Sequence, residues 1–145
     1  SPPMAEKPPT DPAEHAQDFA RRYAHDMDYL AAQRMTELGI PRHLLGAPDF
    51  DGDGSWRAFI ARGRTGGNVT TGITVNSGVF NPALVQGKGS RLWAKARLRD
   101  RVDAVIAHEY EEDRMGTHEL AVKHGAKTQI PISDAARRIL RAMGR

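Results

Sequence analysis

The residues best suited to chemistry lie between positions 104 and 124, in the stretch AVIAHEYEEDRMGTHELAVKH. His108 and Glu112 are four residues apart, so on a helix both side chains emerge from one face, one turn apart. A shared metal ion is the chemistry that this spacing favours. The apolar run at 104–107 indicates that the motif begins in a partly buried part of its helix.

A third ligand would come from His118 or His124, which follow a helix-ending glycine, Gly116. The arrangement follows the logic of a zincin helix, in which the residue after the first histidine activates a metal-bound water. We expect Glu109 to activate the metal-bound water and His108 to be both a metal ligand and a catalytic residue. Because the ligand set would leave one coordination position open, the sequence predicts a catalytic rather than a structural metal site.

The chain contains no cysteine, which excludes thiolate ligation, disulfides and thiol nucleophiles. A metal must therefore be held by histidine and carboxylate. Zinc is the expected divalent ion, with manganese and magnesium as alternatives.

A simpler interpretation of the same stretch is an acidic, solvated helix face. Glu109, Glu111, Glu112 and Asp113 could pair with neighbouring arginines and have no further role. Histidines are not needed on such a face, which favours the metal hypothesis. Against a peptidase of the zincin kind, the second helix ligand is glutamate rather than histidine, and Glu111 stands where such enzymes carry an uncharged residue.

A basic segment, GKGSRLWAKARLRDR at 87–101, precedes the metal motif. Its cations could guide a phosphate backbone toward the metal. The predicted substrate-binding residues are Lys95, Arg97, Arg99 and Arg101. The alternative is that these side chains only neutralise the acidic half of the following helix.

A second metal motif is incomplete. Asp49, Asp51 and Asp53 match the first half of a calcium-binding loop, but its twelfth position is Ile60 instead of a carboxylate. A plain Asp/Gly turn is the alternative.

The elements that position these residues follow from periodicity. Helical spacing predicts one or two helices within 11–38, and alternation of Val69, Ile73 and Val75 with polar residues predicts an antiparallel hairpin or small sheet within 56–80, with a turn at 65–68. A long helix capped by Ser90 is expected to run to about residue 115, followed by a shorter helical piece with His118 and His124. A final helix capped by Ser133 completes an α+β fold that is mostly helical.

Composition agrees with one ordinary globular domain. The chain has 145 residues and a net charge of +3, and 39% of its residues are hydrophobic. We expect residues 13–145 to form a single domain and the Pro-rich residues 1–12 to be a disordered leader or linker. No run is apolar and long enough to cross a membrane, so no membrane association is expected.

The segments NPALVQGKG, RDRVDAVIAHEYEE and HELAVKHGAKTQIPISDAARRIL resemble the C-terminal toxin modules of bacterial polymorphic toxins, including those of RHS-repeat proteins. The resemblance covers about half of the chain. It implies secretion or delivery into a target cell as part of a larger protein, action in the cytoplasm of that cell, and a cognate immunity protein as partner.

The leading hypothesis is therefore a metal-dependent hydrolase acting as a toxin or effector, with nucleic acid as the favoured substrate. Three alternatives stay open: a zincin-like metallopeptidase toxin, a metal-independent RNase, and a binding module without catalysis.

Overall fold

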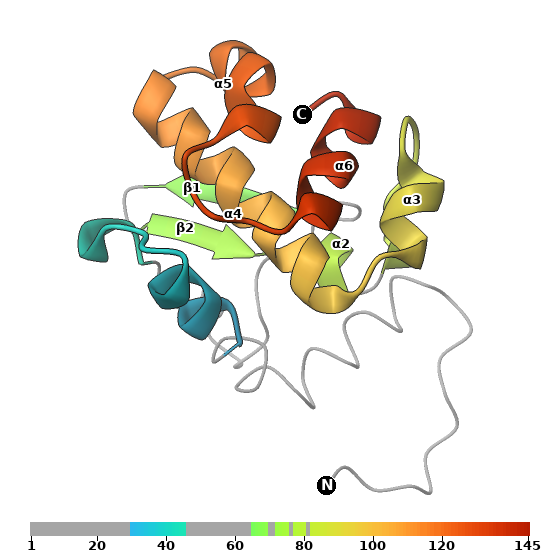
Figure 1. Ribbon diagram of the computed structural model, residues 1–145, viewed down its shortest axis with the longest axis horizontal. Coiled ribbons are helices and arrows are strands. Elements are labelled where there is room, and N and C mark those ends of the chain that lie inside the picture. The colour runs from blue at the N-terminus through green and yellow to red at the C-terminus, as the bar shows by residue number, and fades with distance from the viewer. Residues whose placement is uncertain (1–29, 46–64, 70–71, 76, 81) are drawn as a thin grey trace, which may run out of the picture.

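The computed structural model describes residues 30–45, 65–69, 72–75, 77–80 and 82–145 (Figure 1). The Pro-rich leader at 1–12 and the half calcium loop at Asp49, Asp51 and Asp53 lie outside these residues. Within them the fold is α+β and mostly helical, with one small antiparallel hairpin, as predicted.

The hairpin consists of β1 (Gly66–Val69) and β2 (Gly72–Val75), with Gly66 opposite Val75 in the register. The helical elements after it are α2 (Ser77–Phe80), η3 (Pro82–Leu84), α3 (Ser90–Lys95), α4 (Leu98–Met115), α5 (His118–His124), η4 (Gly125–Lys127) and α6 (Asp134–Met143). Before it lie the helical residues 30–37 and a short turn of 3-10 helix, η1 (Arg42–Leu44).

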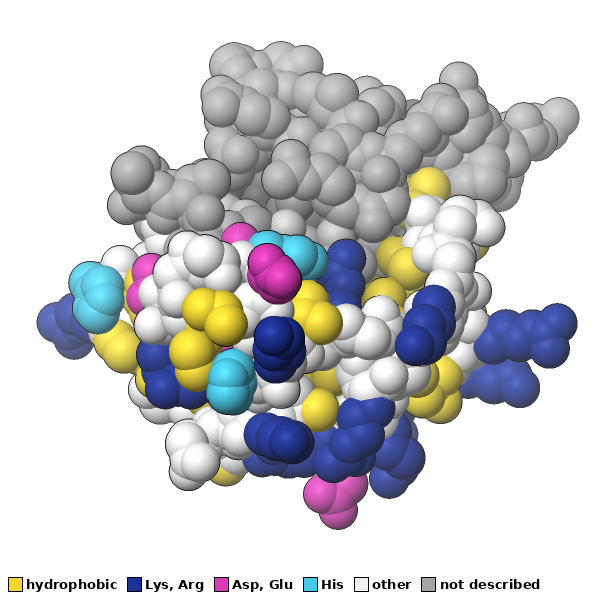
Figure 2. Space-filling model, turned by 90° about the horizontal axis from the view of Figure 1, so that it is seen from above, with side chains coloured by type: hydrophobic (Ala, Val, Ile, Leu, Met, Phe, Trp, Pro, Cys, Tyr) yellow, Lys and Arg dark blue, Asp and Glu magenta, His cyan; other side chains and the backbone are white. Residues whose placement is uncertain are grey.

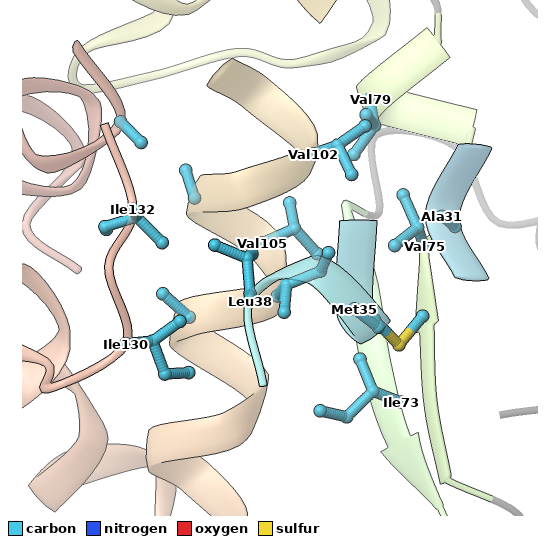
Figure 3. Close-up of a cluster of buried hydrophobic side chains, with 14 of the residues drawn as sticks. Ala31, Met35, Leu38, Ile73, Val75, Val79, Val102, Val105, Ile130 and Ile132 are labelled. Carbon is cyan, nitrogen blue, oxygen red and sulfur yellow. The ribbon is translucent and has the colours of Figure 1, made fainter. Parts of the chain in front are cut away.

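Helix α4 forms the centre of the structure (Figure 1). The hairpin packs on one side of it, and α5 and α6 pack on the other. All residues from Arg101 to Glu109 are buried, as expected of a helix that is covered on several sides. Figure 3 shows the core around it, with Ile130 and Ile132 on one side of α4 and Ile73 and Val75 of β2 on the other.

The predicted turn at 65–68 is wrong, because Gly66 to Val69 form a strand. The glycine at 66 is explained by the close approach of its strand to α4, and not by a turn. A Cβ atom there would lie 2.4 Å from Cγ1 of Val105 and 2.8 Å from the carbonyl oxygen of Thr74. The missing side chain therefore lets the strand lie directly against α4.

The single long helix predicted from Ser90 to about residue 115 is also wrong. The chain breaks between α3 and α4, where Ala96 and Arg97 adopt extended backbone angles. Buried side chains on both sides of this break bond to α2: Trp93 donates its ring N–H to the carbonyl of Gly78, and Arg101 donates to the carbonyl of Val79. Arg101 also donates to the carbonyl of Ala96, at the break itself. Ser90 does not cap α3, since Gly89 occupies the N-cap position and provides no side-chain bond.

The ends of the later helices agree with the sequence. Gly116, with φ of 79°, ends α4, and Ser133 caps α6 by accepting a hydrogen bond from the backbone N–H of Ala136. The helices described here include none that is both long and apolar enough to cross a membrane.

Candidate metal centre

Two ligands of the candidate site come from α4. His108 is 2% exposed, and Glu112 follows one turn later with a side chain that is 32% exposed. Nε2 of His108 lies 3.4 Å from Oε2 of Glu112, so the two side chains point toward the same place.

The third ligand is His118, the first residue of α5. Gly116 and Thr117 are the only residues between α4 and α5, and Gly116 turns the chain back in a left-handed conformation. Thr117 then caps α5 by accepting from the N–H of Leu120. This short reversal places Nδ1 of His118 3.2 Å from Nε2 of His108 and 3.2 Å from Oε2 of Glu112.

The three atoms thus form a triangle with sides of 3.2, 3.2 and 3.4 Å. In a tetrahedral zinc site with bonds of about 2.0–2.1 Å, neighbouring ligand atoms lie about 3.3–3.4 Å apart. A metal ion could therefore be held by His108, Glu112 and His118. Within the described part of the chain, this is the group of His and acidic side chains whose ligand atoms lie close enough together to share an ion.

One ligand is buried and the other two reach solvent. His118 is 59% exposed in its side chain, so the outer side of the triangle is open. An open position is what separates a catalytic zinc site from a structural one.

The surroundings of His108 keep its imidazole neutral, which is the form that binds a metal ion. Burial is the main cause that lowers the pKa of His108 to about 4, and the electrostatic effects of Arg145 and His118 act in the same direction, against the opposing effect of Glu112. The imidazole is therefore neutral at pH 7, with a nitrogen lone pair available. A metal on Nε2 would leave the proton on Nδ1, which is buried and has no hydrogen-bond partner among the described residues.

This pKa predicts how the metal-free protein responds to acid. The folded pKa of about 4 is lower than the unfolded value of about 6.5, so the unfolded state binds more protons between these two values. The contribution of His108 to stability is complete above pH 6.5 and is lost as the pH falls toward 4. We expect about 2 to 3 kcal/mol less stability at pH 4.5 than at pH 7.5 from this residue.

The measurement is urea unfolding in the presence of a chelator at both pH values. His108→Gln should remove this part of the pH dependence, leaving the part that the carboxylates contribute. An equal difference in wild type and variant would show that His108 is not buried in the neutral form.

The other predicted site residues are not in the triangle. His124 ends α5 and is not a member of the ligand group, so His118 is the histidine that the fold brings to the site. Glu109 is 5% exposed, and its Cγ lies 3.5 Å from the position of a Cβ on Gly66, which places it beside β1. Its part as the base that activates water stays a prediction.

The structure agrees with the solvated acidic face only in part, since Asp113 is exposed and Glu111 pairs with Arg114. Glu109 and Glu111 are buried, and Glu111 is completely so. It accepts hydrogen bonds from the hydroxyl of Thr128, at 2.7 Å, and from Arg114, at 2.9 Å. Glu111 therefore ties α4 to the chain before α6, which explains a charged residue in the middle of the motif.

The predicted substrate-binding residues differ in exposure. Lys95, Arg97 and Arg99 are exposed, but Arg101 is 7% exposed and its guanidinium is bonded to backbone carbonyls. The prediction of Arg101 as a substrate contact is therefore wrong: it supports the α3–α4 break. The exposed three lie near the start of α4, and Arg99 precedes His108 by nine residues, or about 14 Å along the helix.

Sequence reasoning missed two residues close to the site, Thr65 and Arg145. Both line a pocket next to His108, and Nη1 of Arg145 lies 3.4 Å from Oγ1 of Thr65. They are 80 positions apart, so no local pattern joins them.

Comparison of the chain with protein-family models, curated proteins and solved structures gives no match. Arguments about function therefore depend on the residues of the site and on their geometry.

Proposed function

We propose that the protein is a metal-dependent hydrolase that cleaves phosphodiester bonds in nucleic acid, and that it acts as a toxin or effector domain. The observation that carries the proposal is the triangle of His108 Nε2, Glu112 Oε2 and His118 Nδ1, with sides that suit one metal ion. Two imidazoles and one carboxylate favour zinc, with manganese or magnesium as alternatives.

A bound divalent ion would acidify a water molecule and polarise a phosphoryl oxygen. The chain would contribute three things. His108, Glu112 and His118 would fix the ion, and the burial of His108 would hold the ligand set in place. Glu109, next to His108 on α4, is the proposed acceptor of the proton of the attacking water.

Surface charge supports nucleic acid as substrate. Helix α3 packs against α6, so these two elements bring cations from distant parts of the chain near one another. The exposed cations of α3, of the start of α4 and of α6, here called the basic surface, are Lys88, Arg91, Lys95, Arg97, Arg99, Arg138 and Arg141. Figure 2 shows one face of the molecule, on which His and acidic side chains lie next to each other. Many Lys and Arg side chains are exposed on the same face.

Arg99 precedes His108 by about 14 Å along α4 and by about two and a half helical turns, so it leaves the helix on the opposite face. The basic surface would therefore bind phosphates at a distance from the reacting one. A long polyanion can span this distance, whereas a small phosphate ester cannot.

The test is cleavage of labelled DNA and RNA by protein loaded with zinc, manganese or magnesium. We expect cleavage that a chelator stops. A casein or peptide substrate is included in parallel: cleavage of peptide but not of nucleic acid would favour the zincin-like peptidase instead. Nuclease activity that resists the chelator would favour the metal-independent RNase.

The basic surface gives a separate prediction. Replacing Lys95, Arg97 and Arg99 together with glutamine should weaken nucleic-acid binding about 10- to 100-fold at low salt and reduce the salt dependence by about three ion contacts, without loss of metal. Binding is measured by fluorescence anisotropy at several salt concentrations.

A single pair of variants provides the control. Arg99→Gln should weaken binding, and Arg42→Gln, which removes an exposed cation from η1, should not. Unchanged binding by the triple variant would remove the argument for a nucleic-acid substrate.

A further inference from the structure

Helix α5 carries the proposed ligand His118 and is too short to be stable by itself. It spans seven residues, and isolated helices shorter than about 12–15 residues are marginal in water. Ala121 is buried and packs α5 on α4, whereas His118 at the start of the helix is exposed (Figure 1). The position of His118 therefore depends on what fixes the two ends of the segment formed by α5 and η4.

Both ends of this segment are tied to α4. The start is tied by the chain itself, since Gly116 and Thr117 alone separate α4 from α5. The far end is tied by Thr128, which follows η4 and is 4% exposed. Its hydroxyl donates a hydrogen bond of 2.7 Å to Oε1 of Glu111, which directly precedes the ligand Glu112 on α4. This bond closes a loop, residues 111–128, that contains all of α5.

The bond from Thr128 to Glu111 is stronger than an ordinary side-chain hydrogen bond. Glu111 is completely buried, and a hydroxyl that donates to a carboxylate away from water makes a charge-assisted bond. The other partner of Glu111 is Arg114, whose side chain is 48% exposed, so water competes for that contact. Without the Thr128 hydroxyl, Oε1 of Glu111 could regain a donor only if the segment after α5 moved away and admitted water.

The backbone around Thr128 is held by α6. Arg137 donates to three carbonyls there, those of Ala126, Thr128 and Ile130, at 2.8, 3.2 and 3.2 Å. Oγ1 of Thr128 accepts from the N–H of Ile130 at 3.3 Å, so its own proton is directed to Glu111. Because α6 itself packs on α4, Thr128 is a fixed point to which the end of the α5–η4 segment is attached.

We propose that Thr128 is a positioning residue for the metal centre: by donating to Glu111 it keeps α5 on α4 and His118 beside the other two ligands. The inference depends on the proposed function, because it concerns a ligand of the proposed metal. The apparent metal affinity is reduced by the fraction of molecules in which the binding-competent arrangement is absent. Loss of the Thr128 hydroxyl therefore weakens metal binding even though all three ligands remain.

The test compares Thr128→Val, which keeps the branched shape and removes the hydroxyl, with Thr128→Ser, which keeps the hydroxyl. In the metal-free full chain we expect hydrogen exchange of the α5 amides to be about 10- to 100-fold faster in Thr128→Val, the effect of losing one bond to a charged group. Zinc affinity, measured by competition with a chromophoric chelator, should fall about 10-fold. Thr128→Ser should resemble wild type in both measurements.

Two further variants separate positioning from general stability. Ile73→Val weakens the core on the β2 side of α4, where Ile73 is 1% exposed. It should lower the midpoint of urea unfolding and leave α5 exchange and zinc affinity as in wild type. Glu111→Gln weakens the bond to Thr128 without removing it, so it should give smaller shifts of the same kind if Thr128→Val does not fold.

Equal exchange of α5 in wild type and Thr128→Val would overturn the inference. Faster exchange with unchanged zinc affinity would also overturn it, because His118 would then not need this attachment. A loss of zinc affinity in Ile73→Val as large as in Thr128→Val would assign the effect to general stability. If wild type binds no zinc, the proposed function is refuted, whereas the exchange measurement, made without metal, still decides whether Thr128 holds α5 in place.

Discussion

Replacing His118 with alanine is expected to lower zinc affinity by about 100-fold or more and to abolish hydrolysis. Its Nδ1 closes the triangle at 3.2 Å from both other ligand atoms, so its removal leaves only two protein ligands. The loss should exceed the 10- to 100-fold effect that is typical of a residue that only supports a ligand. Affinity is measured by competition with a chromophoric chelator, and hydrolysis with labelled nucleic acid.

His124→Ala is the matched control, since His124 lies on the same helix and is not in the ligand group. It should keep wild-type affinity and activity. His118 is exposed, so its replacement should not unfold the protein, and circular dichroism can confirm this. Equal behaviour of the two variants, or a loss confined to His124→Ala, would contradict the proposed ligand set.

The second large effect concerns stability. Arg34 forms a bidentate ion pair with Asp103, with Nε and Nη2 each 2.8 Å from a carboxylate oxygen, and Asp103 is 1% exposed. Arg34→Met would leave this carboxylate buried without its partner. We expect the free energy of unfolding to fall by about 3 to 5 kcal/mol, as measured by urea denaturation.

Two variants show whether the loss comes from the unpaired charge. Glu37 also pairs with Arg34 but is exposed, so Glu37→Gln should cost less than about 1 kcal/mol. Arg34→Met combined with Asp103→Leu removes both charges and should recover most of the stability. A double variant as unstable as Arg34→Met alone would mean that packing, not charge burial, accounts for the effect.

The end of α4 and the start of α6 were predictable because their signals are local. Gly116 and Ser133 act through their own backbone and side chain, and the structure confirms both. The break at Ala96 was not predictable, because it depends on bonds from Trp93 and Arg101 to residues of α2 that are more than ten positions away. For the same reason the sequence predicts a turn at Gly66, although this glycine makes room for Val105.

The site residues also differ in whether local sequence predicts them. The spacing of His108 and Glu112 is a property of any helix, so it brings both side chains to one face. The choice between His118 and His124 depends on how the two residues after α4 turn the chain, which periodicity does not determine. Arg145 reaches the site only through the packing of α6 on α4 and had no local signal.

Buried polar residues were the hardest to predict. Glu111 and Arg101 carry charges that are typical of a surface, yet both are buried and satisfied by hydrogen bonds. The signal that was present is their position within an apolar stretch: Val102, Ala104, Val105, Ile106 and Ala107 are all buried around them. Charged residues inside such a run indicate internal hydrogen bonds as readily as a catalytic role.

The most direct test of the metal centre is the metal-to-protein ratio of the purified chain, measured by plasma mass spectrometry before and after incubation with zinc, manganese or magnesium, in parallel with His108→Ala. The geometry predicts about one zinc ion per wild-type chain and a loss of that ion in the variant. No bound metal in either protein after all three incubations would contradict the metal centre and, with it, the proposed metal-dependent hydrolase.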